Sequence, residues 1–351
     1  MTNSRRAKKA RRTPRSSPRP GPIARVRGAA DVVAMIPYLL GFQPHDSLVV
    51  IALQGPRKRF GPVLRVDLVD DPDLVPQQAA VILEVVTGHR LGPVLVAVFS
   101  DDARRAEPLT SLVLAELAGS GVAVEDAFRA DGRRWWSYLC SNPSCCSPAG
   151  SPYDVRTSAA AAEAVLAGLA FEPDREALRE RFAPSDEIRR HSVAQEVQLL
   201  RDLPATRAPG DTEGLRMGEL VGSRLADPAA AEPSELARLA LLVQSHSGRD
   251  VAMGLIDRAN AARHFELWRH VLVCVSDDLL PPVGCVVAFA AWLDGRGVLA
   301  SHAVERVLAL EPDDSFARLL AELLVAAVDP RHWDLVAPGA TALGDPPPRA
   351  G

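Results

Sequence analysis

Two short, uninterrupted apolar runs constrain the fold of this chain more than any other feature, and they lie at 47–53 (SLVVIAL) and 94–99 (VLVAVF). Runs this short and rich in β-branched residues are typical of strands buried on both faces of a sheet. A helical pattern at 73–88 lies between them, and another at 106–118 follows. Alternating strands and helices predict an α/β fold with a sheet that is at least partly parallel.

Further predicted elements surround these two strands. The run at 63–68 alternates in polarity and forms a natural hairpin partner for 47–53. Apolar spacing predicts a helix at 29–40, which Pro37 should end or kink because proline lacks the backbone N–H that a helix interior needs. A weaker strand is predicted at 122–129. Its candidate partner strand and the next helix lie at 135–139 and 158–169.

The rest of the chain is predicted to be helical, because apolar residues recur near every 3.6 positions and no convincing strand reappears. The predicted helices lie at 175–181, 186–203, 212–226, 233–245, 250–258 and 261–275. The stretch 281–314 then resembles a single tetratricopeptide repeat, with a capping helix at 315–327. Its small, bulky and terminating residues are Ala288, Gly295, Ala300, Val304, Val307, Leu308 and Pro312.

Charge is unevenly distributed along the chain. The first 27 residues carry ten of the 40 Lys and Arg side chains and no acidic one, which leaves 30 basic against 44 acidic side chains elsewhere. The stretch 1–24 lacks apolar periodicity and is predicted to be a disordered basic arm. The other predicted units are an α/β domain with a cysteine loop at 25–170, a helical domain at 171–335 and a disordered tail at 336–351.

The basic arm has two interpretations. It can hold nucleic-acid phosphates or an acidic partner by releasing counterions, or it is a solubilising tail without a specific partner. Nucleic acid is therefore a candidate partner for residues 1–27. The candidate contact residues are Arg5, Arg6, Lys8, Lys9, Arg11 and Arg12.

The sequence favours a cytoplasmic protein without a membrane segment. No apolar stretch or cleavage site of the secretory type follows the basic N-terminus. The longest apolar stretch, 283–293, is far shorter than the ~20 residues that span a bilayer. Five cysteines are also too few for a disulfide scaffold in a chain of 351 residues.

Three cysteines, Cys140, Cys145 and Cys146, fall within seven residues of a loop that also contains Pro and Ser. Grouped thiolates are the ligands that tetrahedral zinc prefers, so zinc is the candidate cofactor. A fourth ligand is missing locally, and His45 or Asp154 are the candidates for it. The alternatives are buried or turn-forming thiols, a disulfide between Cys140 and Cys145, and a redox-active or nucleophilic thiol.

Polar residues cluster where the predicted strands begin and end. Ligands of open α/β sheets bind outside the carboxyl ends of parallel strands, so Asp67 and Asp101 are candidates to hold a metal or act as acid and base. The favoured alternative is that residues 100–102 cap the following helix. Asp46 and Ser47, at the start of a strand, are further candidate ligand-binding residues, although turn formation explains Asp46 and its neighbour His45 better.

Aromatic residues form a second kind of candidate site. Trp135 and Trp136, with Tyr138 nearby and Arg133 and Arg134 before them, can stack on bases or sugars. The alternative, which we favour, is an aromatic strand with one buried side. The aromatic residues on helical patterns further along are predicted to be core, and they are Phe265, Trp268, Trp292 and Trp333.

Two sequence blocks resemble one known family. The first is GFQPHDSLVV at 41–50, preceded by IPYLL, and the second is RWWSYLC at 134–140, followed by NPSCC at 142–146. Three later segments complete the pattern, namely RD at 249–250, ELW at 266–268 and AWL at 291–293. In this order the segments resemble the actinobacterial family catalogued as domain of unknown function 4192, over about 28–320. The resemblance implies an actinobacterial source and no established activity.

Function is less constrained than fold. The sequence lacks Gly-x-Gly-x-x-Gly after a strand, the phosphate-binding Gly-x4-Gly-Lys-Ser/Thr, His-Glu-x-x-His and Gly-x-Ser-x-Gly, so the common enzyme classes lose support. The leading hypothesis is a non-enzymatic regulatory or scaffold protein with a ligand-binding α/β domain and a helical domain that binds a protein partner. The alternatives are a metal- or thiol-dependent enzyme that uses the cysteine loop, and a nucleic-acid-associated protein that uses the basic arm.

Overall fold

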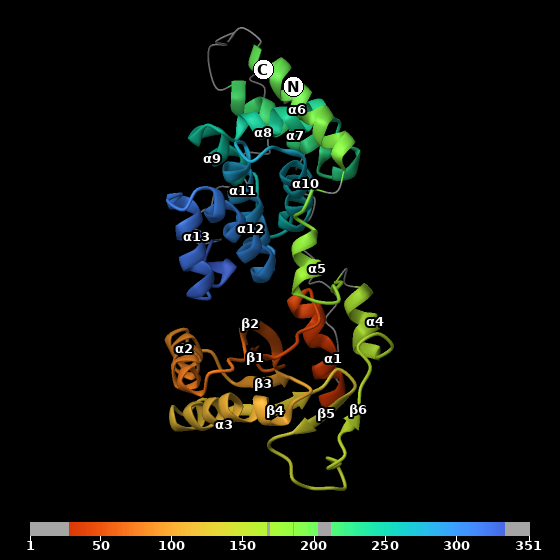
Figure 1. The fold of residues 1–351 in the computed structure, drawn as a ribbon, viewed down its shortest axis with the longest axis vertical. Helices are drawn as coiled ribbons and strands as arrows, with labels where there is room; N and C mark the ends of the chain where they lie inside the picture. The colour runs from red at the N-terminus through yellow and green to blue at the C-terminus, as the bar shows by residue number, and fades with distance from the viewer. Residues whose placement is uncertain (1–27, 167–168, 185, 203–211, 334–351) are drawn as a thin grey trace, which may run out of the picture.

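The computed structural model describes residues 28–166, 169–184, 186–202 and 212–333. In these residues a mixed six-stranded sheet with flanking helices is followed by a helical region, which confirms the predicted fold class (Figure 1). We call residues 28–166 the sheet region and the described residues from 169 onwards the helical region. The predicted arm at 1–24 and tail at 336–351 lie outside the described residues.

The strands follow the order β2-β1-β3-β4-β5-β6 across the sheet. Their bounds are β1 (Ser47–Gln54), β2 (Arg59–Asp67), β3 (Val94–Phe99), β4 (Val124–Ala130), β5 (Arg134–Ser137) and β6 (Ser151–Pro152). The predicted hairpin is confirmed as the antiparallel pair β1–β2. Strands β3 and β4 form a parallel pair, and the other neighbouring strands of this sheet are antiparallel.

The sheet region carries four α-helices and one short 3-10 helix. Their bounds are α1 (Ala29–Leu40), η1 (Pro72–Leu74), α2 (Val75–Gly88), α3 (Ala103–Gly119) and α4 (Ala159–Leu166). Both predicted central strands are buried, because each face of the sheet is covered. Leu48 and Val50 of β1 pack in a cluster with α2 and α3. Val49 and Ile51, on the other face, join a cluster that includes α1 and the helical region.

The predicted helix at 29–40 is confirmed as α1, and Pro37 does not end it. The helix continues through the proline to Leu40 and is capped by Gly41, whose backbone N–H donates to the Pro37 carbonyl at 2.8 Å. Gly41 has a φ of 81°, a left-handed conformation that glycine adopts at little cost. Ile36 and Tyr38, on either side of the proline, are buried. Packing on both sides therefore outweighs the one helical hydrogen bond that proline removes.

The helical region contains nine α-helices in its described part, and Figure 1 shows it stacked on the sheet region along the long axis of the molecule. The bounds are α5 (Arg175–Glu180), α6 (Glu187–Asp202), α7 (Thr212–Arg224), η2 (Pro228–Ala230), α8 (Pro233–Leu242), α9 (His246–Gly254), α10 (Ala261–Cys274), α11 (Leu280–Leu293), α12 (Gly297–Leu310), α13 (Ser315–Val325) and η3 (Pro330–His332). Among the described residues of both regions, no helix is long and apolar enough to cross a membrane.

Helix α9 begins earlier than predicted. The apolar pattern placed it at 250–258, but the structure has it at His246–Gly254. The side chain of Ser245 accepts the backbone N–H of Gly248 at 3.0 Å, which satisfies a free donor of the first turn. The Ser245 cap therefore determines where α9 begins, and a prediction from apolar spacing alone missed it.

Helices α11 and α12 correspond to the predicted tetratricopeptide-like unit. They pack closely where Gly284 faces Val307, since a Cβ at Gly284 would lie 2.4 Å from a Val307 methyl group. Ala288 is buried, as its predicted role in a close helix crossing requires. One helix pair does not test a repeat, so the repeat-like character stays a prediction.

The two regions meet through apolar and charged contacts. Ile51 of the sheet and Val307 of α12 belong to the same buried cluster. At the sheet edge, Arg175 of α5 lies 3.6 Å from Asp67 and 3.3 Å from Glu305 of α12. The division into domains at 170/171 stays a prediction.

Candidate metal site

The cysteine loop, residues 138–150, connects β5 to β6 and is fixed at its base. Arg134 donates to the carbonyls of Ala149 and Gly150 at 3.2 and 2.9 Å. The indole Nε1 of Trp136 donates to the Pro148 carbonyl at 3.2 Å. Gly150 has a φ of 78°, and a Cβ there would lie 2.5 Å from the Trp136 ring. The two ends of the loop are therefore held together by the side chains of β5.

Local hydrogen bonds shape the tip of the loop. The hydroxyl of Ser137 accepts the backbone N–H of Cys140 at 3.0 Å. The backbone N–H groups of Cys145 and Cys146 both donate to the Asn142 carbonyl, at 3.1 and 2.8 Å. The Asn142 side chain also accepts the N–H of Ser144 at 3.0 Å. This turn folds the pair of cysteines back towards Cys140.

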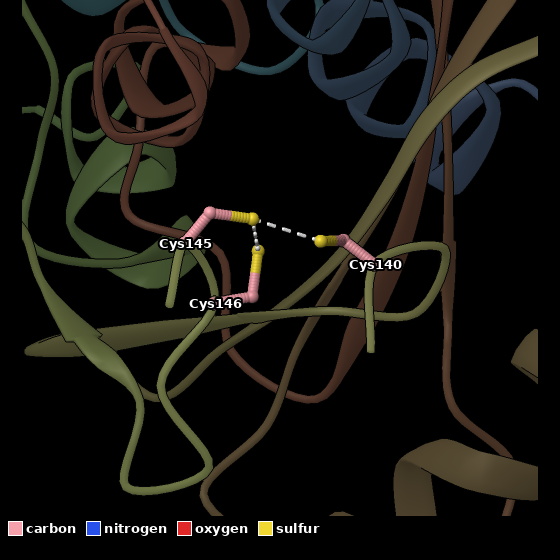
Figure 2. A group of neighbouring side chains, drawn as sticks. All are labelled: Cys140, Cys145 and Cys146. Atoms are coloured by element: carbon pink, nitrogen blue, oxygen red, sulfur yellow. Dashed lines mark hydrogen bonds between the residues drawn. The ribbon is translucent and has the colours of Figure 1, made fainter. Parts of the chain in front are cut away.

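The structure brings the three predicted sulfur atoms together (Figure 2). The Sγ atoms of Cys140 and Cys145 are 3.0 Å apart, and those of Cys145 and Cys146 are 3.5 Å apart. All three lie within 4.8 Å of one another. Two sulfur atoms bound to one tetrahedral zinc at about 2.3 Å are about 3.8 Å apart, so small side-chain rotations bring the cluster to zinc geometry.

The electrostatics of the cluster favour a bound cation. Contact with Cys145 lowers the pKa of Cys140, because a hydrogen bond from Cys145 stabilises the Cys140 thiolate. The same contact raises the pKa of Cys145, and contact with Cys140 raises that of Cys146 to about 12. A thiolate at Cys140 opposes ionisation of its two neighbours, since like charges repel. A divalent cation removes that repulsion, and the all-sulfur donor set suits zinc.

Neither sequence candidate for a fourth ligand joins the three cysteines. Within the described residues, the group close enough to share one metal ion consists of the three cysteines, without His45 or Asp154. The carboxylate of Asp154 instead accepts hydrogen bonds from the backbone of Arg156 and the hydroxyl of Thr157, both at 2.7 Å. These bonds lower the pKa of Asp154.

Asp46 lies in an ion-pair network at the end of the sheet where β1 begins and β3 ends. Its carboxylate accepts hydrogen bonds from the Ser100 hydroxyl at 2.7 Å and from Arg105. Arg105 also pairs with Asp70 at 2.8 Å. Asp46 has a φ of 39°, in agreement with the expected turn. A metal ion at Asp46 would have to displace a guanidinium group.

Ser47 and Asp67 meet at Arg65 of β2. Arg65 donates to the Ser47 hydroxyl at 2.7 Å and pairs with Asp67. Burial lowers the pKa of Arg65, and the charge of Asp67 opposes that shift. Because Arg175 also lies beside Asp67, this carboxylate has two cationic neighbours. The arrangement fixes the strand end to α5.

Asp101 and Asp102 follow β3 after Ser100. The Asp102 side chain accepts the backbone N–H of Arg104 at 2.8 Å and begins α3, so the capping interpretation is confirmed for this residue. Asp101 is exposed. Among the described residues, no cluster that could share a metal ion includes Asp67 or Asp101. Ligand roles for Asp46, Ser47, Asp67 and Asp101 stay predictions.

The two tryptophans of β5 point to opposite faces of the sheet, as successive strand residues do. Trp135 packs edge-on against Phe128, with ring centroids 5.5 Å apart. The guanidinium of Arg129 lies 3.8 Å from the centroid of the Trp136 ring. One ring therefore belongs to the core and the other to the base of the cysteine loop. A role in stacking on bases or sugars stays a prediction for both.

The predicted core aromatics of the helical region are confirmed for Phe265, Trp268 and Trp292, which are buried. Trp333 is half-buried and packs edge-on against Phe289, with ring centroids 5.0 Å apart.

The predicted arm residues lie outside the described residues. They are Arg5, Arg6, Lys8, Lys9, Arg11 and Arg12.

A pocket of about 380 Å³ lies at the opposite end of the sheet, where β1 ends and β3 begins. The sequence did not predict it. It lies between the β1–β2 turn, the loop before β3 and the C-terminal segment after α13. Its lining includes Gly55, Arg90 and Arg331, and Arg331 pairs with Asp329 at 2.8 Å. These segments are far apart in the sequence, so no local pattern reveals the pocket.

The fold and the site define a class of protein: a mixed-sheet region that presents three clustered cysteines, followed by a helical region. The chain belongs to the family described as Domain of unknown function (DUF4192), whose model matches residues 30–331. The family prediction is thereby confirmed, and the actinobacterial source stays a prediction. No curated protein and no solved structure matches the chain.

Proposed function

We propose that this chain is a regulatory or scaffold protein whose cysteine loop binds a zinc ion and whose helical region binds a protein partner. The observation that carries the proposal is the convergence of the Cys140, Cys145 and Cys146 sulfur atoms within 4.8 Å. A loop that only needed hydrophobic anchors would bury its cysteines, whereas Cys145 is exposed and the other two are half-exposed.

Zinc would fix the tip of the loop, as the side chains of β5 already fix its base. Structural zinc sites contribute apparent binding free energy on the order of 10 kcal/mol, more than a short turn supplies by itself. The zinc ion would hold the three sulfur atoms at one point and leave a fourth position facing outwards. That position is accessible to water or to a side chain of a partner.

The zinc proposal is tested with the full-length protein purified under reducing conditions. We expect about one zinc ion per chain by elemental analysis, and a melting temperature that falls when a chelator is added. The double variant Cys145→Ser, Cys146→Ser should lose the metal. Ser144→Ala is the matched control, because Ser144 lies in the same turn and provides its backbone N–H. Zinc-free protein with an unchanged melting temperature in the double variant would exclude the site.

A second candidate function is a metal- or thiol-dependent enzyme. It is favoured by a three-ligand cluster at the surface, since catalytic zinc sites have three protein ligands and an open position. Alkylation rates at each cysteine separate the two functions. Bound zinc with slowly alkylated thiols indicates a structural site, whereas one rapidly alkylated thiol in metal-free protein indicates chemistry.

Partner binding by the helical region is supported by exposed apolar side chains on α6. Ile188 and Leu199 are 82% and 62% exposed. They are separated by three helical turns and therefore share one face of the helix. Replacing both with Asp should abolish co-purification of a partner from the native cell and leave the melting temperature unchanged. Co-purification that survives the change would place the partner elsewhere.

A further inference from the structure

The three cysteines are not equally spaced. The sulfur atoms of Cys140 and Cys145 are 3.0 Å apart, closer than those of Cys145 and Cys146. The sulfur atoms of a disulfide bond are about 2.05 Å apart, so these two sulfur atoms must move about 1 Å closer to form one. Cys145 and Cys146 are 3.5 Å apart and adjacent in the chain, so a disulfide between them would close an eight-membered ring that includes their peptide bond. The geometry therefore favours a disulfide between Cys140 and Cys145 and leaves Cys146 as a free thiol.

We propose that Cys140 and Cys145 are a reversible disulfide pair oxidised by hydroperoxides, and that forming this disulfide releases the zinc ion. The release of zinc rests on the function proposed above, whereas the disulfide does not. Oxidation removes two of the three thiolate ligands, and Cys146 alone does not hold zinc in competition with water. The site would then report peroxide by a change in its metal content.

The chemistry balances with hydrogen peroxide as the oxidant. One thiolate of the pair attacks a peroxide oxygen, the O–O bond breaks, and a sulfenic acid and hydroxide form. The second thiolate attacks the sulfenic sulfur, the S–S bond forms, and the second hydroxide leaves. Two protons convert the two hydroxides to water. In total, two zinc-bound thiolates, one peroxide and two protons give one disulfide, two waters and a free zinc ion.

The fold confines this reaction to the tip of the loop. Arg134 and Trp136 hold the base through backbone carbonyls, and neither contact uses a cysteine. The remaining cysteines, Cys274 and Cys285, are 5% and 1% exposed in the helical region and serve as internal controls. Oxidation should therefore change the loop and leave the rest of the fold intact.

The experiment treats zinc-loaded full-length protein with hydrogen peroxide in the presence of a chromogenic zinc chelator. We expect zinc release together with loss of alkylation at Cys140 and Cys145, while Cys146 is still alkylated. Dithiothreitol should restore alkylation of the pair. Cys146→Ser should still form the disulfide, Cys145→Ser should not form it, and Ser144→Ala should behave like the wild-type protein.

The outcomes separate this inference from the zinc proposal. If the wild-type protein binds zinc but all three thiols stay open to alkylation after peroxide, the disulfide pair is wrong and the metal site stands. If the pair forms in a protein that never binds zinc, the disulfide stands and the metal site is wrong. Irreversible oxidation of Cys140 or Cys145 to sulfinic acid, without a disulfide, would also overturn the inference.

Discussion

Trp136 and Gly150 show how closely single residues determine the cysteine loop. The indole ring occupies the space where a side chain at Gly150 would lie, and the backbone at Gly150 has a φ of 78°. Arg129 covers the ring at 3.8 Å from its centroid. Because these contacts set the base of the loop, they also determine where the sulfur atoms lie.

Gly150→Ala should destabilise the protein through two effects, backbone strain at positive φ and collision of the new Cβ with Trp136. Gly121→Ala is the matched control, because Gly121 has a φ of 73° and nothing within 4 Å of its Cβ position. We expect the control to cost about 1 kcal/mol and Gly150→Ala to cost about 1–3 kcal/mol more. Urea denaturation measures both. Equal losses would show that Trp136 does not constrain the loop.

His264 should make stability depend on pH. It is 1% exposed, its Nδ1 has no hydrogen-bond partner, and burial lowers its pKa from 6.5 to about 4. The unfolded chain therefore takes up a proton below about pH 6.5, and the folded protein does so only near pH 4. The neutral form favours the fold, so this contribution is complete above pH 6.5 and is lost as the pH falls.

We expect His264 to contribute a loss of about 3 kcal/mol in unfolding free energy between pH 7 and pH 4. His264→Gln lacks this titration, so its unfolding free energy should fall less over the same range. Urea titrations at several pH values measure the difference. His270 and His302, whose pKa values burial also lowers, are present in both proteins and cancel in the comparison. Parallel pH profiles would contradict the assignment.

At the scale of elements, the fold follows from the sequence wherever one local pattern determines one element. The apolar runs at 47–53 and 94–99 became β1 and β3 because a strand covered on both faces needs no polar side. The order of the strands was not predictable in this way. Strand β1 lies between β2 and β3 and is antiparallel to both, and that placement depends on contacts across the chain.

The same distinction applies to the candidate site. The cysteine cluster was predictable because its members lie within one turn of a loop. The pairing of Asp46 with Arg105 was not, because these residues are 59 positions apart and neither lies in a recognisable motif. Asp46 pairs with Arg105 of α3, and Asp67 lies beside Arg175 of α5, so both carboxylates tie strand ends to helices.

The contact of α11 with α12 gives a prediction for this pair of elements. Gly284→Ala should gain up to about 1 kcal/mol of helix propensity, yet destabilise the protein by about 1–3 kcal/mol overall, because its Cβ meets a Val307 methyl group at 2.4 Å. In the background of Val307→Ala the same change should be neutral or stabilising. A double-mutant cycle measured by urea denaturation gives the coupling. A stabilising Gly284→Ala in the wild-type background would show that the helices separate easily.

At the scale of the whole molecule, the sheet and helical regions share one buried cluster that contains residues such as Ile51 and Val307. An ion pair adds to this junction, because Arg175 of α5 lies 3.6 Å from Asp67 at the end of β2. Exposed ion pairs contribute about 1 kcal/mol or less each. The apolar cluster therefore contributes most of the free energy that holds the two regions together.

The basic arm makes a prediction that the rest of the molecule does not share. If Arg5, Arg6, Lys8, Lys9, Arg11 and Arg12 contact phosphates, the logarithm of the affinity for duplex DNA should fall with the logarithm of salt concentration with a slope of about −5. A chain that starts at residue 28 has 30 basic and 44 acidic side chains. Its net negative charge should abolish binding and leave zinc content and melting temperature unchanged. Fluorescence anisotropy at several salt concentrations measures the slope. Equal binding by the full-length and shortened chains would assign nucleic-acid affinity to another surface, and no binding by either would leave the arm as a solubilising segment.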